Sequence, residues 1–392
     1  MASSTKPLAG VRVVELARVL AAPTAGQILA DLGADVVKLE APAGDDTRGW
    51  GPPYITLDDG ESYGAAYFGA CNRGKRSAVV DLKTEAGRAL ARKLAAHADV
   101  FLENFKVGGL AAYGLDYLSL RALNPRLVYC SVTGFGQTGP YAHRPGYDFL
   151  AQGMGGLMHV TGEIGARPLR AGIAASDLGG GLYAAIGVQA ALLQRERTGE
   201  GSHVDVALLD ATVSLLAYLG VNYLAGGPEP GRQGNTHPSL VPYQPFETED
   251  GLMIVAAGND GQFERLCGVL GCEHLLEDER FARNNARVVN RAACEAALAP
   301  IIRTWRREAL IAALEAAGVP AGPVNTVAEV FADPHVRARG LALSSEGAPG
   351  IRTPLIIGGE KAESGRPPKL GEHQAEIEAA DGWPAPNPAA AD

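Results

Sequence analysis

Short apolar runs alternate with longer amphipathic stretches through the first third of the chain. The apolar runs predict β-strands at 11–17, 35–40, 78–82, 99–105 and 127–132. The stretches between them have helical spacing and predict helices at 23–34, 84–97 and 108–123. Strands that alternate with helices at this rhythm are typical of a parallel sheet. We therefore expect an α/β fold with a doubly wound parallel sheet, whose ligands bind at the carboxyl ends of the strands.

Polar and glycine-rich segments follow three of these strands, where a ligand is expected. They are R-V-L-A-A-P at 18–23, N-F-K at 104–106 and G-F-G-Q-T-G-P at 134–140. The first lacks the G-x-G-x-x-G pattern of dinucleotide-binding loops, and the third lacks the Lys-Ser/Thr of a Walker motif. Taken alone, the third segment is most simply a turn.

A single acid, Asp177, stands in the apolar and small-residue stretch 170–193. Three glycines follow it at 179–181, and a long apolar helix pattern comes next. An aspartate before a helix usually caps the helix start. It can also be a carboxylate nucleophile, exposed where glycines let a substrate approach the backbone. The residues alone favour the cap and leave the nucleophile open.

The second half of the chain changes in character. A further strand at 203–209 and a helix at 211–224 precede a Gly/Pro-rich loop at 225–238, which indicates a domain crossing. A hairpin turning at 249–251 and four helices between 261 and 317 then predict a smaller α+β unit. We expect a large domain at 1–224, a small α+β domain at 225–325 and a return segment at 326–392 that completes the large domain.

Composition excludes several classes of protein. The chain of 392 residues is 46% hydrophobic and 20% charged, as in ordinary globular proteins. Its net charge of −9 argues against a nucleic-acid partner. The N-terminus lacks the apolar core of a signal peptide and no apolar segment is long enough to span a membrane, so we expect a cytoplasmic protein without a membrane partner. The five scattered cysteines predict neither disulfides nor a metal site.

Six motifs, in their order and spacing, resemble the class III coenzyme A (CoA) transferases of the formyl-CoA transferase type. They are D-L-G-A-D-V-V-K-L-E (31–40), G-D-D-T-R-G-W (44–50), N-R-G-K-R-S (72–77), D-V-F-L-E-N-F (99–105), S-V-T-G-F-G-Q-T-G-P (131–140) and the Asp177 segment. R-P-G-Y-D (144–148) and G-N-T-H-P (234–238) look most like the succinyl-CoA:glutarate transferase branch. The resemblance implies a Rossmann-like CoA-binding large domain, a small domain and an interlocked homodimer.

The resemblance also implies a reaction. The aspartate that matches Asp177 is the nucleophile of the family, which forms an aspartyl–acyl anhydride and then an aspartyl-CoA thioester. The implied activity moves CoA from an acyl-CoA donor, such as succinyl-CoA, to a free carboxylic acid, such as the dicarboxylate glutarate. CoA thioesters are then substrates, and no permanently bound cofactor is implied.

Further site residues match family positions one by one. The matches imply CoA contacts at Leu20, Ala21, Leu82, Lys83, Asn104, Phe105 and Lys106. Tyr147 and Asp148 match an aromatic residue and an acid near the active aspartate, and they join Asp177 as catalytic candidates.

The chain departs from the family at two basic positions. Two arginines that lie on the phosphate side of CoA in the family are Ala41 and Ala112 here. From proximity in the sequence, we expect their role to pass to one or more of Arg48, Lys75, Arg76 and Lys106. Each of these side chains is, taken singly, more often a solvated surface charge.

Two other functions are compatible with the fold: a racemase of 2-methylacyl-CoA esters and a non-catalytic CoA-binding protein. Related racemases of 2-methylacyl-CoA esters have a histidine where this chain has Tyr147, and a phenol with a pKa of about 10 is a poor base for an α-proton. A racemase therefore ranks below the transferase, as does a non-catalytic CoA-binding protein. Arg232 and His237 are candidates to bind the distal carboxylate of a dicarboxylic acid, although His237 is equally compatible with a structural role.

Overall fold

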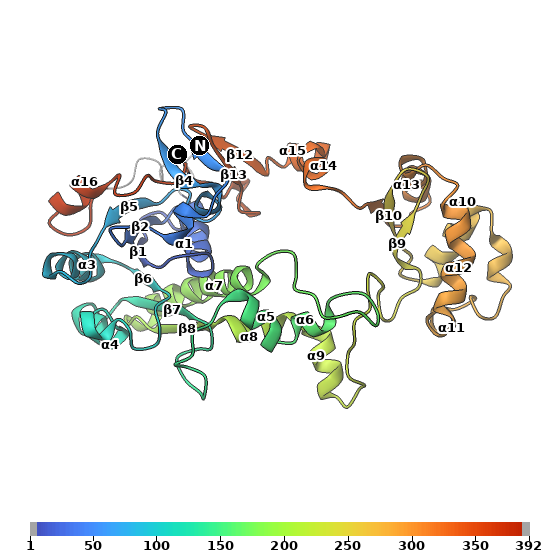
Figure 1. Cartoon of the computed structure of the whole chain (residues 1–392), viewed down its shortest axis with the longest axis horizontal. Coiled ribbons are helices and arrows are strands. Elements are labelled where there is room, and N and C mark those ends of the chain that lie inside the picture. The colour runs from blue at the N-terminus through green and yellow to red at the C-terminus, as the bar shows by residue number, and fades with distance from the viewer. Residues whose placement is uncertain (1–5, 386–392) are drawn as a thin grey trace. The chain divides into compact units, whose positions relative to one another are not determined.

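A six-stranded parallel sheet forms the centre of the fold (Figure 1). The computed structural model describes residues 6–385; residues 1–5 and 386–392 lie outside the described residues. The strands are β1 (Arg12–Leu16), β2 (Asp35–Glu40), β5 (Arg76–Val79), β6 (Val100–Glu103), β7 (Val128–Thr133) and β8 (His203–Ala207). They lie in the order β5-β2-β1-β6-β7-β8. Numbered along the chain, this is the doubly wound order 3-2-1-4-5-6, so the predicted α/β class is confirmed.

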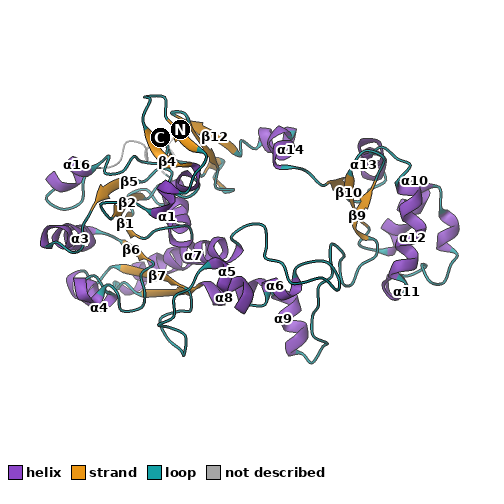
Figure 2. Ribbon diagram, viewed as in Figure 1, coloured by secondary structure: helices purple, strands orange, loops and turns teal. Residues whose placement is uncertain are grey.

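Helices cover both faces of this sheet (Figure 2). The covering helices are α1 (Ala21–Asp31) and α7 (Ala175–Thr198) on one face, and α3 (Glu85–His97), α4 (Tyr117–Leu123) and α16 (Gln374–Ala379) on the other. Successive strand residues point to opposite faces, so Val13 joins the first core and Val14 the second. Because both faces are buried, the strand ends and their loops are left to build a site.

Two predicted helices are each divided in the structure. Residues 108–123 contain a 3-10 turn, η2 (Ala111–Tyr113), followed by α4, and residues 211–224 fall in α8 (Leu208–Leu215) and α9 (Ala217–Leu224). The first break lies at Gly114, whose φ of 66° is left-handed, and the second at Ala217, whose φ is 45°. Both backbone conformations interrupt a helix, whatever the apolar spacing on either side.

The three glycines after Asp177 lie inside α7, whereas the sequence pattern suggested that the helix follows them. A Cβ on Gly181 would lie 2.6 Å from the carbonyl oxygen of Ala21, and one on Gly180 would lie 2.8 Å from a methyl group of Leu208. Glycine costs about 1 kcal/mol in a helix interior relative to alanine. The close packing of α7 against α1 and α8, which these glycines permit, offsets this cost in helix propensity.

The chain divides into two compact units. The first comprises the described residues up to Met158, Arg170–Pro228 and those from Pro334 on; the second comprises His159–Leu169 and Glu229–Asp333. The predicted domain boundaries stay a prediction, and the compact units differ from them chiefly in placing His159–Leu169 in the second unit. The shorter elements of the first unit are η1 (Asp46–Gly49), β3 (Tyr54–Thr56), β4 (Ser62–Ala65), α2 (Ala66–Gly69), α5 (Asp148–Met154), α15 (Pro334–Ala338), β12 (Ala342–Ser345), β13 (Ala348–Ile351), β14 (Ile356–Ile357) and β15 (Glu360–Lys361), while α6 (Leu157–Val160) spans the boundary.

The second unit packs helices against a small antiparallel sheet around its own apolar core. Its elements are β9 (Tyr243–Glu247), β10 (Leu252–Ala256), α10 (Asp260–Leu270), η3 (Glu273–Leu276), α11 (Asn284–Val289), α12 (Arg291–Ile302), α13 (Arg307–Ala316), β11 (Ala321–Pro323) and α14 (Val327–Ala332). The predicted hairpin is present, as β9 and β10. Of the four helices expected between 261 and 317, the second was predicted at 278–284, but α11 begins only at Asn284. Over residues 6–385, no helix is both long and apolar enough to cross a membrane.

Candidate active site

The loops after β1 and β6 meet where the strand order of the sheet reverses. The side-chain amide of Asn104 joins them: its oxygen accepts the N–H of Arg18 at 3.1 Å, and its nitrogen donates to the Arg18 carbonyl at 2.7 Å. Doubly wound sheets bind their ligands in the crevice at this point. Asn104, a predicted CoA contact, therefore holds the crevice wall in place.

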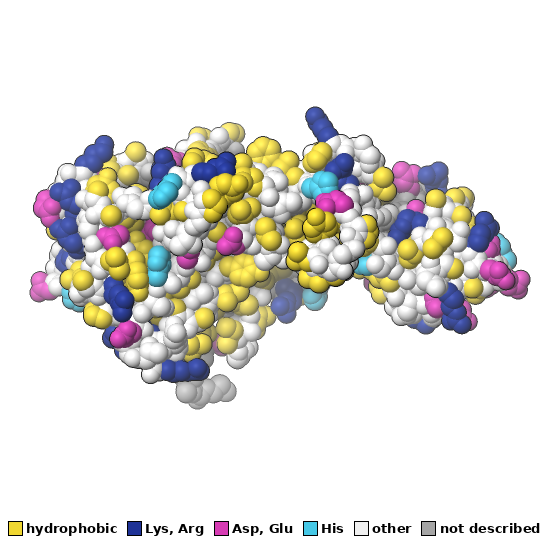
Figure 3. Space-filling view, turned by 90° about the horizontal axis from the view of Figure 1, so that it is seen from below, with side chains coloured by type: hydrophobic (Ala, Val, Ile, Leu, Met, Phe, Trp, Pro, Cys, Tyr) yellow, Lys and Arg dark blue, Asp and Glu magenta, His cyan; other side chains and the backbone are white. Residues whose placement is uncertain are grey.

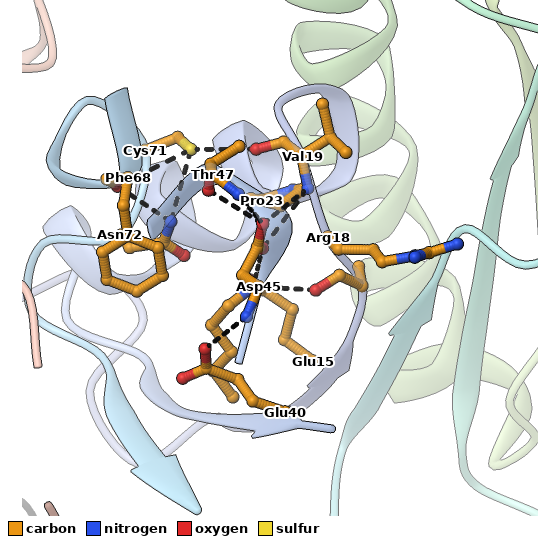
Figure 4. Close-up of polar contacts among 12 residues, drawn as sticks. Glu15, Arg18, Val19, Pro23, Glu40, Asp45, Thr47, Phe68, Cys71 and Asn72 are labelled. Carbon is orange, nitrogen blue, oxygen red and sulfur yellow. Dashed lines mark hydrogen bonds and ion pairs between the residues drawn. The ribbon is translucent and has the colours of Figure 1, made fainter. Parts of the chain in front are cut away.

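Val19, the next residue of the first loop, is strained. Its φ of 71° is a left-handed conformation that costs a β-branched residue about 1–3 kcal/mol. Contacts on both sides hold it there (Figure 4): its N–H donates to the Asp45 carboxylate at 3.3 Å, and its carbonyl accepts the Cys71 thiol at 3.4 Å. The held peptide leads directly into Leu20 and Ala21, where α1 begins.

Asp45 belongs to a buried network of charged side chains behind this loop. The ammonium nitrogen of Lys38 lies 2.9 Å from a carboxylate oxygen of Glu15 and 3.0 Å from one of Asp45, and Lys75 lies 2.6 Å from the other oxygen of Glu15. Burial alone would raise the pKa of Asp45, but the charge of Lys38 and hydrogen bonds from Thr47 hold it below its ordinary value. Breaking such a pair costs about 3–5 kcal/mol, so the network fixes the loop firmly.

Three of the four basic residues predicted to hold phosphates are committed to such internal pairs. The Lys75 side chain is 0% exposed, and that of Arg76 is 2% exposed and pairs with Asp35. Arg48 donates to both oxygens of Glu40 at 2.7 Å. These internal pairs disfavour a role in phosphate binding for the three side chains, and that role stays a prediction. Of the four, Lys106 lies on the wall of a cavity.

A cavity of about 410 Å³ opens at the strand-order reversal. The predicted site residues on its wall are Leu20, Ala21, Asn104, Phe105, Lys106, Tyr147 and Asp177. They come from segments far apart in the chain, which the fold brings to one place. The volume lies in the range of about 300–1,000 Å³ typical of small-molecule sites.

Asp177 lies in the first turn of α7, but it is not the cap of that helix. The residue at the cap position, Ala174, offers no side-chain hydrogen bond. Asp148 on α5 takes this role, because one of its oxygens accepts the N–H groups of Ser176 at 2.8 Å and Asp177 at 3.3 Å. Its other oxygen accepts the amide of Gln152 at 2.8 Å. The capping alternative for Asp177 is thereby removed, and its carboxylate is on the cavity wall.

The surroundings of Asp177 disfavour its charge. Burial, and then the negative charge of Asp148, raise the pKa of Asp177 to about 7 from an ordinary 3.8. Burial and the charge of Asp177 raise the pKa of Tyr67 in turn, so this phenol stays protonated near the carboxylate. Trp50 meets Tyr67 edge-on at 5.2 Å and lines the cavity. A carboxyl group with a strongly perturbed pKa in a cavity is typical of functional sites.

The remaining predicted CoA contacts line an adjoining cavity of about 360 Å³. Leu82 and Lys83 are on its wall. The two cavities share Arg18, Asp46, Phe105 and Tyr113. The structure thus places every predicted CoA contact, apart from the three internally paired cations, around two neighbouring cavities of the first unit.

The cavity wall also includes residues that were not predicted as site residues, among them Arg18, Trp50 and Arg144. Arg18 pairs with Asp46 at 3.1 Å. Trp50 ends the motif G-D-D-T-R-G-W and Arg144 begins R-P-G-Y-D, so both stood inside quoted motifs. A position in a loop motif does not show whether a side chain faces a cavity. The fold was therefore needed to assign these residues to the cavity wall.

Arg232 and His237 belong to the second unit. Arg232 donates to the carbonyl of His159 at 3.0 Å. The Nδ1 atom of His237 accepts the N–H of Ser239 at 3.1 Å, and its ring lies 5.2 Å from that of Tyr243. These contacts order the local turns, and the predicted role of both residues in substrate binding stays a prediction.

Comparison with known proteins connects this geometry to a chemistry. The sequence model of CoA-transferase family III matches residues 8–374. The chain belongs to this family. This family III chain is 52% identical to the succinate–glutarate CoA-transferase of Agrobacterium fabrum over 96% of both proteins. It is 40% identical to the succinyl-CoA:glutarate CoA-transferase of Homo sapiens, over 96% of this chain and 86% of the human protein.

A solved structure agrees with the fold of this CoA-transferase. A CAIB/BAIF family protein from Brucella suis is 55% identical, with a TM-score of 0.88 over 96% of this chain and 99% of that one. The predicted enzyme class is therefore confirmed: the protein is a class III CoA-transferase, with acyl-CoA and carboxylic acid substrates. Family membership leaves the acid open, since a relative from Acetobacter aceti, 40% identical, is named for acetyl-CoA and oxalate.

Proposed function

We propose that this transferase moves CoA from succinyl-CoA to a dicarboxylic acid such as glutarate, with Asp177 as its nucleophile. The observation that carries the proposal is the position of Asp177 on the wall of a cavity whose other walls hold the positions matched to CoA contacts. The names of the 52% and 40% identical relatives support succinate and glutarate as the pair of acids.

The proposed reaction passes through covalent intermediates on Asp177. A carboxylate oxygen attacks the thioester carbonyl, the C–S bond breaks, and CoA leaves as its thiolate, which gives an aspartyl–acyl anhydride. The thiolate attacks the aspartyl carbonyl, forming aspartyl-CoA and releasing the donor acid as a carboxylate. The acceptor carboxylate then attacks aspartyl-CoA and displaces the thiolate, which attacks the acyl carbon of the acceptor and regenerates Asp177. Every C–S bond that breaks is matched by one that forms, and no net proton moves.

The start of helix α1 supplies a second element of the proposed chemistry. Leu20 and Ala21, at the start of α1, share the cavity wall with Asp177 in the first turn of α7. First-turn N–H groups carry the partial positive charge of the helix dipole. They therefore suit the oxyanion that develops when a carboxylate adds to a thioester.

Positioning raises the effectiveness of a weak nucleophile. We assign this role to Asp148, whose carboxylate holds the N–H of Asp177 at 3.3 Å. Tyr147, with a ring 70% exposed on the cavity wall, is proposed to pack against the acyl chain. Binding energy from the CoA tail along the cavity of Leu82 and Lys83 would be used to orient the thioester. CoA enters as a substrate, and no permanently bound cofactor is part of the proposal.

We also propose that the protein is a homodimer, which the resemblance implies to be interlocked. Three neighbouring helices of the first unit, α7, α8 and α9, expose large apolar side chains. They include Leu182, Ile186, Val213, Val221 and Leu224, each at least half exposed. Figure 3 views this side of the unit and shows apolar side chains gathered there. Contiguous apolar faces mark interaction surfaces, and a two-fold copy is the commonest partner.

The proposed location is the cytoplasm. All five cysteines are free and buried. Free thiols are the normal state of cysteine in the reducing cytosol, which supports the proposal. The net charge of −9 is in keeping with small-molecule substrates and with the absence of a nucleic-acid partner.

Substitution of the nucleophile tests the proposal. Asp177→Asn should lower transfer of CoA from succinyl-CoA to glutarate by at least about 1,000-fold, because an amide does not attack a thioester. Intact mass after incubation with succinyl-CoA should reveal a CoA adduct on the native enzyme and none on the variant. The matched control is Asp210→Asn, which changes an exposed acid in the first turn of α8. Full activity of Asp177→Asn would remove Asp177 from its role, and a native enzyme that transfers CoA to no dicarboxylic acid would overturn the function.

A further inference from the structure

Arg144 is a cation on the wall of the Asp177 cavity. Its guanidinium lies over two aromatic rings, 4.6 Å from the centre of Tyr141 and 5.5 Å from that of Phe135. No ion pair joins it to a carboxylate among residues 6–385. A guanidinium held over a ring keeps its N–H edge available, and two parallel N–H donors match the two oxygens of a carboxylate.

The loop that carries Arg144 is closed and anchored. It runs from the end of β7 to α5, and its two ends touch at Gly134 and Gly146, where a Cβ on the first would lie 2.5 Å from the Cα of the second. The N–H of Leu209 donates to the carbonyl of Gly134 at 3.1 Å. Within the loop, the N–H of Arg144 donates to the carbonyl of Tyr141 at 2.9 Å. The guanidinium is thus held by its backbone and by its rings before any ligand arrives.

The loop is also tied to the nucleophile. It leads directly into Tyr147 and Asp148, and the Asp148 carboxylate accepts the N–H of Asp177. Arg144 and Asp177 therefore belong to one connected piece of structure around the same cavity. A substrate whose reacting carboxyl group meets Asp177 extends along a wall on which Arg144 is available.

The other cations on this wall are occupied or face elsewhere. Arg18 pairs with Asp46 at 3.1 Å. Lys106 also lines a third cavity, of about 270 Å³, and its position matches a CoA contact of the family. Arg144 matches none of the CoA positions and lines the cavity of the nucleophile itself.

We propose that Arg144 binds the distal carboxylate of the dicarboxylic acid, on the free acceptor and on the succinyl group of the donor alike, and so sets the preference for dicarboxylates over monocarboxylates. The inference rests on the proposed function, since it assigns the acid-recognition group of that same site. It places this group on Arg144 rather than on the sequence candidates Arg232 and His237 of the second unit.

The test compares glutarate with pentanoate, the monocarboxylic acid of equal length, in the native enzyme and in Arg144→Gln. The variant should raise the KM for glutarate by about 10- to 100-fold, the effect expected of a lost charge-assisted hydrogen bond, and should leave that for pentanoate unchanged. Arg144→Lys keeps the charge without the two-point geometry and should recover part of the loss. Arg121→Gln is the matched control, because Arg121, on α4, forms an exposed ion pair with Glu200.

A binding measurement separates a carboxylate from a phosphate as the anion that Arg144 holds. Calorimetry should give the same Kd for free CoA in the native enzyme and in Arg144→Gln, and a weaker Kd for glutarate in the variant. Weakened CoA binding with unchanged glutarate binding would assign Arg144 to the phosphates and overturn the inference, as would no change in either. If the native enzyme shows no turnover with dicarboxylates, the proposed function fails, but the two Kd values for glutarate still decide the role of Arg144.

Discussion

Asp177 carries two opposing demands on a single carboxyl group. In its proposed role as a nucleophile it must be ionised, yet burial and the charge of Asp148 raise its pKa to about 7. The hydrogen bond from the Asp177 N–H to Asp148 is made by the same acid that opposes ionisation. The carboxylate that forms is poorly solvated, and a poorly solvated anion is a stronger nucleophile than one in water. Asp148 therefore helps to place Asp177 and adds to the rise in its pKa, which burial dominates.

The pH dependence of turnover should report this pKa. Below about pH 7 a growing fraction of Asp177 is protonated, so log kcat/KM should rise with unit slope up to that pH and then level off. Asp148→Asn removes the second cause of the shift while its amide oxygen still accepts the N–H of Ser176, so the rise should move to lower pH. The measurement is a pH–rate profile of the native enzyme and of Asp148→Asn. An unmoved rise in the variant would mean that another group titrates, and Glu103, whose pKa burial raises to about 7, is the group to examine next.

The raised pKa of Asp177 should make activity rise with pH, but it makes the stability of the fold fall with pH. Because the folded-state pKa of Asp177 is raised, the folded protein holds this proton more tightly than the unfolded chain does. That contribution to the free energy of unfolding is fully present below the ordinary pKa of 3.8 and is lost as the pH rises through about 7. In the pH range in which its proposed reaction requires a carboxylate, Asp177 therefore no longer contributes this stability.

Helix α7 illustrates what apolar spacing can and cannot predict at the level of an element. Its existence and its C-terminal end at Gly199, with a φ of 77°, agree with simple rules. Its start does not, because propensity places glycine outside helices while the contact with α1 requires glycine inside this one. Packing against α1 and α8 determines the helical conformation of residues 179–181, and the local sequence pattern does not contain these long-range contacts.

Two neighbouring glycines of α7 give a matched test of this packing. A Cβ on Gly181 would lie 2.6 Å from the carbonyl oxygen of Ala21, so Gly181→Ala must displace α1, whose first residue lines the cavity. We expect a loss of about 1–3 kcal/mol in stability together with reduced activity. At Gly179 the nearest atoms are 3.8 Å away, so Gly179→Ala should stabilise the protein by about 0.5–1 kcal/mol through its higher helix propensity. Denaturant unfolding checks both, and equal effects of the two would contradict the role of close packing.

At the scale of the whole molecule, the sequence predicted a parallel α/β sheet, whereas the strand order and the partners of individual cations came from the structure. Strand alternation predicts a parallel sheet, and a parallel sheet places its ligand at the strand ends. Lys75 and Arg76, in the motif N-R-G-K-R-S, were candidates to hold phosphates, yet both are buried in ion pairs with acids distant in the chain. Arg144 begins the motif R-P-G-Y-D and was not among the predicted site residues, yet it lines the cavity of Asp177. Which cation meets which acid depends on long-range contacts that spacing along the chain does not encode.

The apolar face of α7, α8 and α9 extends the argument to assembly. Leu182 and Ile186 are 54% and 60% exposed, and burying each against a partner contributes about 1.5–3 kcal/mol. The combined variant Leu182→Glu with Ile186→Glu should therefore weaken a dimer by several orders of magnitude, whereas Leu118→Glu, at a 71% exposed position on α4, should not. Light scattering at micromolar concentration should give twice the mass of one chain for the native protein and for the control, and one chain for the combined variant. A native protein that is monomeric and fully active would show that the face serves another purpose, and a combined variant that remains dimeric would place the interface elsewhere.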